Sequence, residues 1–403
     1  MMASTLRRAL CGALHAALLT TIASAPQALG QSTTVVGAPT SQQRIALPIG
    51  SPSTDVVPSG SIDLSGHPNC GAAVRPWSAT FTPDGRHLYV SLFGGFLGSG
   101  GCTVLHLDGI SGAVLGSIPV GETPEDIALQ VGPGGQLLRG FVTCSSGSSV
   151  DVFNAQDQTI ASIALPPQVG GSFPTVFPFG IVIDEARNTV WVATNDGSGR
   201  IFGIDLSTLT LDPARTLQLG LDRGVARFAL HQGQLIIPTF RFTPGFTGSI
   251  AELLIVDPDR GTPTDALLLA QASSTGAFPA PQEVVITPDG RALIAGFDMG
   301  PLVYVVHLAS RTQLSPFPTF TNQPLGKFQC MALSDDGLLV VADFFTGELS
   351  RMSAFDGTLL GITDSTDLVG FHDAFTAALF RPDQSELMLV ATGSDSIARL
   401  LVQ

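Results

Sequence analysis

Three charged side chains, Asp126, Arg227 and Glu283, hold the same place in different copies of a repeated segment of this sequence. If the copies face a common axis, two carboxylates and a guanidinium meet there. Such a group can orient a polar ligand, or it can use Asp126 or Glu283 as a general base while Arg227 stabilises a developing oxyanion. An ion pair that only fills the space with neutralised charge would use the same residues, and the sequence leaves both interpretations open.

Two histidines are further candidates for proton transfer. His372 precedes Asp373 where the last copy begins, and an adjacent carboxylate can tune an imidazole that titrates near neutrality. Neighbouring residues of a strand point to opposite faces, however, so this pair need not touch, and a plain loop histidine fits equally. His67 lies near the first copy and has the same alternative. The sequence contains no Gly-x-Ser-x-Gly motif, so it gives little support to a nucleophilic serine.

These positions are equivalent because the sequence contains an internal repeat. The segment Ala79–Val90, ATFTPDGRHLYV, returns as Val284–Ala295, VVITPDGRALIA. Asp84 and Asp383 hold the same turn position 299 residues apart, which makes six intervals of about 50 residues. Weaker copies bring the total to seven and cover 127–138, 181–192, 228–237, 331–341 and 378–390.

Each copy predicts the same four strands. A short apolar strand ends in a turn such as Pro-Asp-Gly, and a second strand such as Leu88–Leu92 follows. After a Gly/Ser-rich loop, a third strand ends at a residue suited to an Asx turn, such as Asp108, and a tight reversal leads to a fourth strand such as Val114–Pro119. Seven such units without helical periodicity predict an all-β, seven-bladed β-propeller with four-stranded antiparallel blades.

The inner strands of such a ring begin at one mouth of its central channel, where ligands usually bind. The residues at these strand entrances are Trp77-Ser78, Glu125-Asp126, Phe179-Gly180, Ala226-Arg227, Gln282-Glu283, Gln329-Cys330 and Thr376-Ala377. From them we select as ligand-binding candidates Trp77, Glu125, Asp126, Phe179, Arg227, Gln282, Glu283 and Gln329. Charges within about 6 Å of one another in an open mouth would favour an enzyme. A plug formed by Trp77, Phe179 and Phe375 would favour a binding scaffold.

Two long loops between second and third strands, Phe93–Gly101 and Arg241–Ala251, face the same mouth. Both are rich in glycine and carry phenylalanines, namely Phe93, Phe96, Phe242 and Phe246. These aromatic side chains could offer a surface to a sugar or a peptide, or they could pack on one another and cap the blades.

The end of the chain predicts how the ring closes. The last copy supplies only three strands before Gln403, whereas Gly60–Pro68, GSIDLSGHP, resembles Gly116–Pro124, GSIPVGETP, the fourth strand and exit of the first copy. We therefore expect the early strand to complete the last blade and remove its open edge. The expected domains are a signal peptide over 1–30, a Ser/Thr/Pro-rich arm over 31–59 and the propeller over 60–403.

The first 30 residues have the pattern of a secretory signal peptide. Arg7 and Arg8 precede an apolar stretch over 9–22, which is too short to span a bilayer, and small residues follow with a preferred cleavage after Gly30. Export permits disulfides, and four cysteines remain after the leader. We predict that Cys70 pairs with Cys102 at the loop face, with Cys144 as the competing partner.

Composition excludes several classes of protein. Gly 45 and Pro 28 argue against long helices, and 44% hydrophobic residues argue against disorder. A net charge of −14 disfavours nucleic acid. No run after the leader is long enough to span a membrane, and the spacing of Cys and His suggests no metal and no cofactor. Acidic loops at 195–199 and 393–396 only loosely suggest calcium. The expected partners of this monomer are a polysaccharide, a peptide or an envelope protein.

The stretch PDGRHLYV at 83–90, followed by VLGSIPVG at 114–121, resembles the YVTN-type repeat of the lactonase-like seven-bladed propellers. The resemblance covers residues 60–403 and implies a seven-bladed ring. Members include exported repeat proteins and sugar-lactone hydrolases. The resemblance carries no lactonase-specific residue set onto this chain. The function expected first is therefore an exported binding or scaffold protein that uses one loop face, and the alternative is a lactone hydrolase that uses Asp126, Glu283 or His372 as the base.

Overall fold

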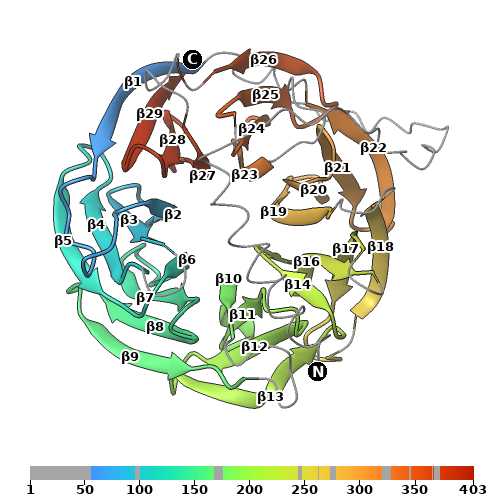
Figure 1. Ribbon diagram of the computed structural model, residues 1–403, viewed down its shortest axis with the longest axis horizontal. Helices are drawn as coiled ribbons and strands as arrows, with labels where there is room; N and C mark the ends of the chain where they lie inside the picture. Colours follow the sequence, from blue (N-terminus) through green and yellow to red (C-terminus); the bar gives the residue numbers. More distant parts are fainter. Residues whose placement is uncertain are drawn as a thin grey trace.

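The computed structural model describes residues 56–95, 100–167, 176–243, 247–261, 263–272, 278–319, 328–344, 346–364, 366 and 373–403. In this part of the chain, seven antiparallel sheets stand around a common axis as the blades of a β-propeller (Figure 1). The predicted fold class is confirmed. The predicted signal peptide and nearly all of the predicted arm lie outside the described residues.

The strands of each blade follow one another from the axis outward. Blade 1 contains β2 (Pro76–Phe81), β3 (His87–Leu92), β4 (Thr103–Asp108) and β5 (Val114–Pro119). Blade 2 contains β6 (Pro124–Val131), β7 (Leu137–Cys144), β8 (Ser149–Asn154) and β9 (Thr159–Ala164). Blade 3 contains β10 (Pro178–Asp184), β11 (Thr189–Thr194), β12 (Arg200–Asp205) and β13 (Thr210–Gln218), with a short 3-10 turn, η2 (Glu185–Arg187), after β10.

The fourth blade differs because its innermost strand is split. It contains β14 (Arg223–Val225) and β15 (Ala229–His231), both paired with β16 (Gln234–Phe242), then β17 (Ser249–Val256) and β18 (Pro263–Gln271). Blade 5 contains β19 (Ala280–Ile286), β20 (Arg291–Phe297), β21 (Leu302–His307) and β22 (Thr312–Pro318). Blade 6 contains β23 (Phe328–Leu333), β24 (Leu338–Asp343), β25 (Leu349–Ser353) and β26 (Leu359–Thr363).

The seventh blade closes the ring with both ends of the described chain. Its inner strands are β27 (Phe375–Phe380), β28 (Glu386–Ala391) and β29 (Ser396–Val402), and its outermost strand is β1 (Val56–Asp63). The pairs run from Val56 opposite Val402 to Asp63 opposite Ser396, so the predicted closure is confirmed (Figure 1). The strand begins four residues before the predicted boundary at 60, because the edge tolerates Pro58 and a bulge between Pro58 and Gly60.

The repeated turn residues act through their side chains. Thr82 donates a hydrogen bond to Asp84 at 2.6 Å, and Asp84 accepts one from the Arg86 amide at 3.1 Å, while Gly85 takes φ +67°. At the end of the third strand, Asp108 accepts hydrogen bonds from two backbone amides of the following turn. The predicted structural role of these acidic residues is confirmed.

Apolar side chains gather between blades rather than within one blade. Each of the seven interfaces between neighbouring blades holds its own buried cluster, such as Tyr89 and Val104 of blade 1 with Val142 and Phe153 of blade 2. A blade therefore buries both faces only when the ring is complete, as expected for stacked repeat units. Among the described residues, no helix has the length and hydropathy of a membrane span.

A disulfide joins Cys70 to Cys102, with the Cα atoms 5.9 Å apart, as predicted. Cys144 and Cys330 are buried as free thiols. The bond ties the segment before β2 to the start of β4.

Removing this bond in the variant Cys70→Ser/Cys102→Ser should lower the free energy of unfolding by about 2 to 4 kcal/mol, because the cross-link restricts the unfolded chain. Urea unfolding with and without dithiothreitol measures the change. The reductant should shift the wild-type midpoint and leave the variant unchanged. A wild-type protein that is insensitive to reduction would contradict the prediction.

Candidate functional site

The innermost strand of every blade is interrupted near its start. The interruptions lie at the same level along the ring axis, at the mouth of the central channel where these strands begin. The ladder between the first and second strands loses its register in six blades, and in blade 4 the gap between β14 and β15 takes the same place. The residues skipped by the ladder include Trp77, Ser78, Glu125, Asp126, Phe179, Ala226, Arg227, Gln282, Gln329 and Thr376. They include seven of the eight ligand-binding candidates selected from the sequence, and the eighth, Glu283, pairs with Ala295 directly after the interruption.

Backbone groups released by these interruptions are satisfied by hydroxyls and by neighbouring blades. Thr143 of β7 accepts a hydrogen bond from the Asp126 amide at 3.0 Å and donates one to the Phe179 carbonyl of blade 3 at 2.7 Å. Ser91 of β3 accepts from the Ser78 amide and donates to the Glu125 carbonyl of blade 2, both at 3.0 Å. Each hydroxyl therefore links its own inner strand to the next one around the ring.

Replacing Thr143 with valine should lower the free energy of unfolding by about 1 to 3 kcal/mol, because the variant keeps the shape but leaves the Asp126 amide and the Phe179 carbonyl buried without this partner. Urea unfolding measures the loss. Thr216→Val is the matched control, since Thr216 is only half-buried on the outer strand β13. Equal losses in the two variants would contradict the proposed link between blades.

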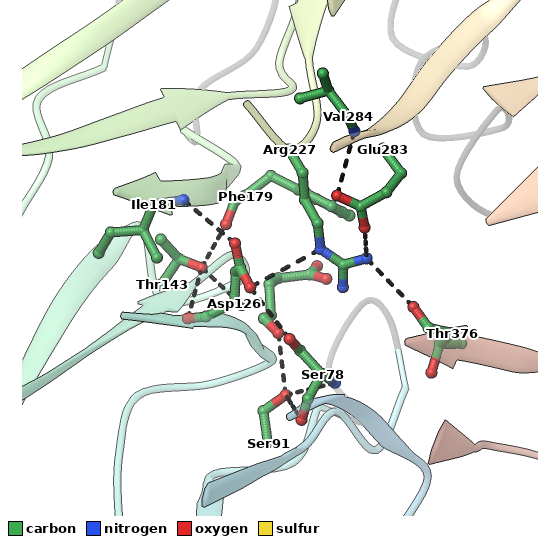
Figure 2. A network of polar contacts seen from close by, with 11 residues as sticks. Ser78, Ser91, Asp126, Thr143, Phe179, Ile181, Arg227, Glu283, Val284 and Thr376 are labelled. Carbon is green, nitrogen blue, oxygen red and sulfur yellow. Dashed lines mark hydrogen bonds and ion pairs between the residues drawn. The ribbon is translucent and has the colours of Figure 1, made fainter. Parts of the chain in front are cut away.

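Arg227 reaches across the channel from blade 4 and contacts three other blades (Figure 2). Its Nη1 donates to Glu283 Oε2 of blade 5 at 2.8 Å and to the Thr376 carbonyl of blade 7 at 3.3 Å. Its Nε lies 3.8 Å from Asp126 Oδ1 of blade 2. We call Asp126, Arg227 and Glu283 the channel cluster. The structure thus brings together the three charges that the sequence placed at equivalent positions.

Asp126 extends this network to two more blades. Its Oδ1 accepts a hydrogen bond from Ser78 Oγ of blade 1 at 3.1 Å, and its Oδ2 accepts one from the Ile181 amide of blade 3 at 3.4 Å (Figure 2). Six of the seven blades therefore send a polar group to Asp126 or Arg227. The three side chains of the channel cluster are 10% to 16% exposed, so solvent still reaches them.

Burial dominates the acid–base behaviour of the cluster. Removal from water raises the pKa of Glu283 to about 7, although the Arg227 charge opposes this shift. The same removal from water raises the pKa of Asp126, again against the pull of Arg227. Two carboxyls near a single cation therefore give the site more potential negative charge than it can neutralise.

Glu125 is a third acid beside the cluster and is fully buried. Its Oε1 accepts a hydrogen bond from Ser145 Oγ at 2.8 Å, and burial raises its pKa to about 8. At neutral pH this carboxyl keeps its proton.

Aromatic side chains close the channel beside the charges. Trp77 and Phe93 of blade 1 form one buried group with Phe179 of blade 3 and Ala226 of blade 4, and the Trp77 and Phe93 rings stack at 4.6 Å. Because blade 1 is not adjacent to blades 3 and 4, this group spans the channel. Phe375 does not join it, and packs instead in the core between blades 6 and 7.

Of the loop phenylalanines, Phe93 and Phe242 are buried against other aromatic side chains, so they cap the blades rather than offer a free surface. Phe96 and Phe246 lie outside the described residues.

The remaining candidates have less definite places. Gln282 is buried in the interruption of β19, and Gln329 lies in β23. His372 lies outside the described residues, while Asp373 accepts hydrogen bonds from the Ala374 and Gly393 amides, both at 2.7 Å, as a turn residue does. His67 is half-buried in the loop after β1. Within the described ranges, no group of three or more His, Cys, Asp or Glu side chains is arranged to hold a metal ion.

Sequence reasoning did not find the hydroxyls that support the cluster. Ser91 and Thr143 are each the second-to-last residue of a second strand and are fully buried there, and this shared position of a hydroxyl is the signal that could have revealed them.

Comparison with known proteins supports the fold. No protein-family model matches the sequence, and no curated protein matches it. A solved structure of Kuenenia stuttgartiensis hydrazine synthase is similar, with a TM-score of 0.64 and 17% sequence identity over 84% of this chain and 98% of that chain. At this level of identity the similarity concerns the propeller fold alone.

Proposed function

We propose that the chain is an exported binding protein of the lactonase-like, YVTN-type propeller class, and that it holds its ligand or partner at the mouth of the channel. One observation carries this proposal. Polar groups from six blades meet on Asp126 and Arg227 at one end of the channel, beside an aromatic group that closes it. A polar mouth beside an aromatic group that spans the channel suits binding better than passage through the ring.

The Cys70–Cys102 disulfide supports export, because such bonds persist in oxidising compartments. The proposal includes removal of residues 1–30, a monomeric state, and a polysaccharide, a peptide or an envelope protein as the partner class. The acidic composition supports a partner other than nucleic acid.

A lactone hydrolase is the second candidate, and one observation favours it. The pKa of Glu283 is about 7, which suits a general base at neutral pH, and Arg227 lies 2.8 Å away to stabilise an oxyanion. The burial of the cluster and the aromatic closure of the channel favour binding over turnover.

Thermal unfolding of the protein from residue 31 onward, in the presence of saccharides, peptides and lactones, tests the proposal, because a ligand that binds the native state raises the unfolding temperature. Stabilisation without product formation supports the binding protein. Lactone turnover that disappears in Glu283→Gln would instead establish the hydrolase. If no saccharide, peptide or lactone shifts the transition, the proposed binding function fails.

A further inference from the structure

Two histidines and an aspartate join blades 1 and 2 at the end of the blades away from the channel mouth. His106 of β4 lies 2.9 Å from Asp157, between Nδ1 and Oδ2, and its Nε2 lies 2.8 Å from His87 Nδ1. His87 begins β3, and Asp157 lies in the turn between β8 and β9. The three side chains therefore form one chain of hydrogen bonds that runs from blade 1 to blade 2.

The packing around His106 is shaped for this contact. The Tyr89 ring stacks on the His106 ring at 4.6 Å. Gly116 of β5 pairs with His106 across the ladder, and a Cβ atom at this position would collide with Asp157 Oδ2, so the glycine lets the carboxylate reach the imidazole. The other oxygen of Asp157, Oδ1, is buried and has no hydrogen-bond partner in the described part of the chain. The carboxylate is therefore committed to His106.

The hydrogen bonds fix which nitrogen atoms carry protons. A carboxylate only accepts hydrogen bonds, so His106 Nδ1 carries the proton of its bond to Asp157. In a neutral imidazole the other nitrogen is an acceptor, so His106 Nε2 accepts from His87 Nδ1. One further proton, on His87 Nε2, leaves this chain intact. With two further protons, both nitrogens of the His87–His106 contact carry hydrogen, so the bond between the rings cannot form and two positive charges face each other.

On blade 1, two further carboxylates lie near His87. Asp108 pairs with His87 across the ladder and Asp84 lies in the turn before it, and both interact electrostatically with the imidazole. Hydrogen bonds within their own turns lower the pKa of both carboxyls, so they stay charged in mild acid. Tyr89, stacked on His106, stays uncharged because burial raises its pKa. Nearby carboxylates therefore balance a single positive charge on the histidine pair.

Two arginines belong to the elements that pack here. Arg86, in the same turn as Asp84, is 75% exposed and lies 4.0 Å from that carboxylate. On blade 2, Arg139 of β7 points away from the contact, because side chains alternate along a strand and its neighbour Gly140 lies against Phe153 on the face toward blade 1. The positive charges that oppose each other on double protonation are therefore those of the two histidines.

We infer that His87, His106 and Asp157 form a proton-sensitive latch between blades 1 and 2, which is closed while at least one of the two imidazoles is neutral and opens when both are protonated. An unperturbed histidine titrates near about pH 6.5, so both rings carry a proton at pH 5 in the unfolded chain. The folded pair must then either bind one proton fewer or lose the contact. In both cases mild acid weakens the joint between the two blades, whether or not a ligand is bound at the channel mouth.

The variant His87→Asn tests the latch. The asparagine amide can donate to His106 Nε2 or, turned over, accept from it, and it carries no charge. Wild type and variant are unfolded with urea at pH 6.5 and pH 5.0. Over this range the unfolded wild type binds up to one proton more than the closed latch, so stability falls as the pH falls. The unfolding equilibrium constant should therefore rise about 5- to 10-fold more in the wild type than in the variant.

His307→Asn is the matched control and should follow the wild type, since His307 bonds to Ser310 within its own turn of blade 5. The latch is overturned if His87→Asn and wild type are equally sensitive to acid, or if His307→Asn is as resistant as His87→Asn.

Should His87→Asn not fold, hydrogen exchange of the wild type decides. After correction for the intrinsic rate, amides of β4 and β9 should lose protection between pH 6.5 and pH 5.0, because local openings that separate the latch bind more protons. Amides of β21 and β22 should keep their protection. Unchanged protection in β4 and β9 would overturn the latch.

Discussion

Replacing Arg227 with methionine should lower the free energy of unfolding by about 3 to 5 kcal/mol at pH 7, because removing one partner of a buried ion pair leaves the other buried without compensation. Methionine keeps much of the length of the side chain but none of its charge. Asp126 and Glu283 would then lie near each other without the cation that now faces both. Urea unfolding measures the loss.

The decrease in the free energy of unfolding caused by Arg227→Met should be larger at higher pH. Without the cation, the pKa values of Asp126 and Glu283 rise further above their ordinary values, so the folded variant keeps protons that the unfolded chain releases. A group with a raised folded pKa contributes stability that is lost as pH rises, so the variant should be closer to wild type at pH 5 than at pH 8.

Arg260→Met is the control for this substitution, since Arg260 is 73% exposed in its pair with Asp257 and should matter little. If Arg227→Met costs no more than the control at pH 8, the channel cluster does not hold the blades together.

Replacing Glu125 with glutamine should make the protein less sensitive to alkaline pH. The folded pKa of Glu125 is about 8 against an ordinary value of 4.5, so the folded state holds a proton that the unfolded chain has lost in this window. In the wild type, the contribution of Glu125 to the free energy of unfolding is fully present below pH 4.5 and declines as the pH rises toward 8. Between pH 5 and pH 9 the decline is on the order of 4 kcal/mol. The variant avoids it, because glutamine does not ionise.

Urea unfolding of Glu125→Gln and wild type at pH 5 and pH 9 measures the difference in slope. Glu283 titrates in both proteins, so its contribution largely cancels in the comparison. Glu185→Gln, in the exposed turn η2, is the control and should follow the wild type. Parallel pH profiles for Glu125→Gln and wild type would show that Glu125 does not carry the predicted raised pKa.

The seven-bladed fold could be predicted from the sequence, because the turn and strand motifs that define each blade are local and recur along the chain. A Pro-Asp-Gly turn at Asp84 fixes a hairpin by its own hydrogen bonds, and seven copies of such a pattern require seven blades. The likeness of Gly60–Pro68 to Gly116–Pro124 predicted the closing strand for the same reason.

The contacts of the candidate site could be predicted only in part. Equivalent positions in the repeat place Asp126, Arg227 and Glu283 at one height, but they do not say how far a side chain reaches across the axis. In blade 4 the interruption is wide enough to divide the innermost strand into β14 and β15, with Arg227 between them, and the repeat pattern does not contain this break. Phe375 turns into the core between two blades, because a local loss of register decides which way a side chain points.

The closing blade also determines how the described part of the chain would respond to a pull on Val56 and Val402. These two residues are the first pair of the β1–β29 ladder, so both lie at the same end of that ladder. A force between them acts across the strands, along the interstrand hydrogen bonds, and loads one pair at a time. Under tension, the pairs of this ladder should therefore break one after another, and the ring should open at a lower force than if all the pairs were loaded together.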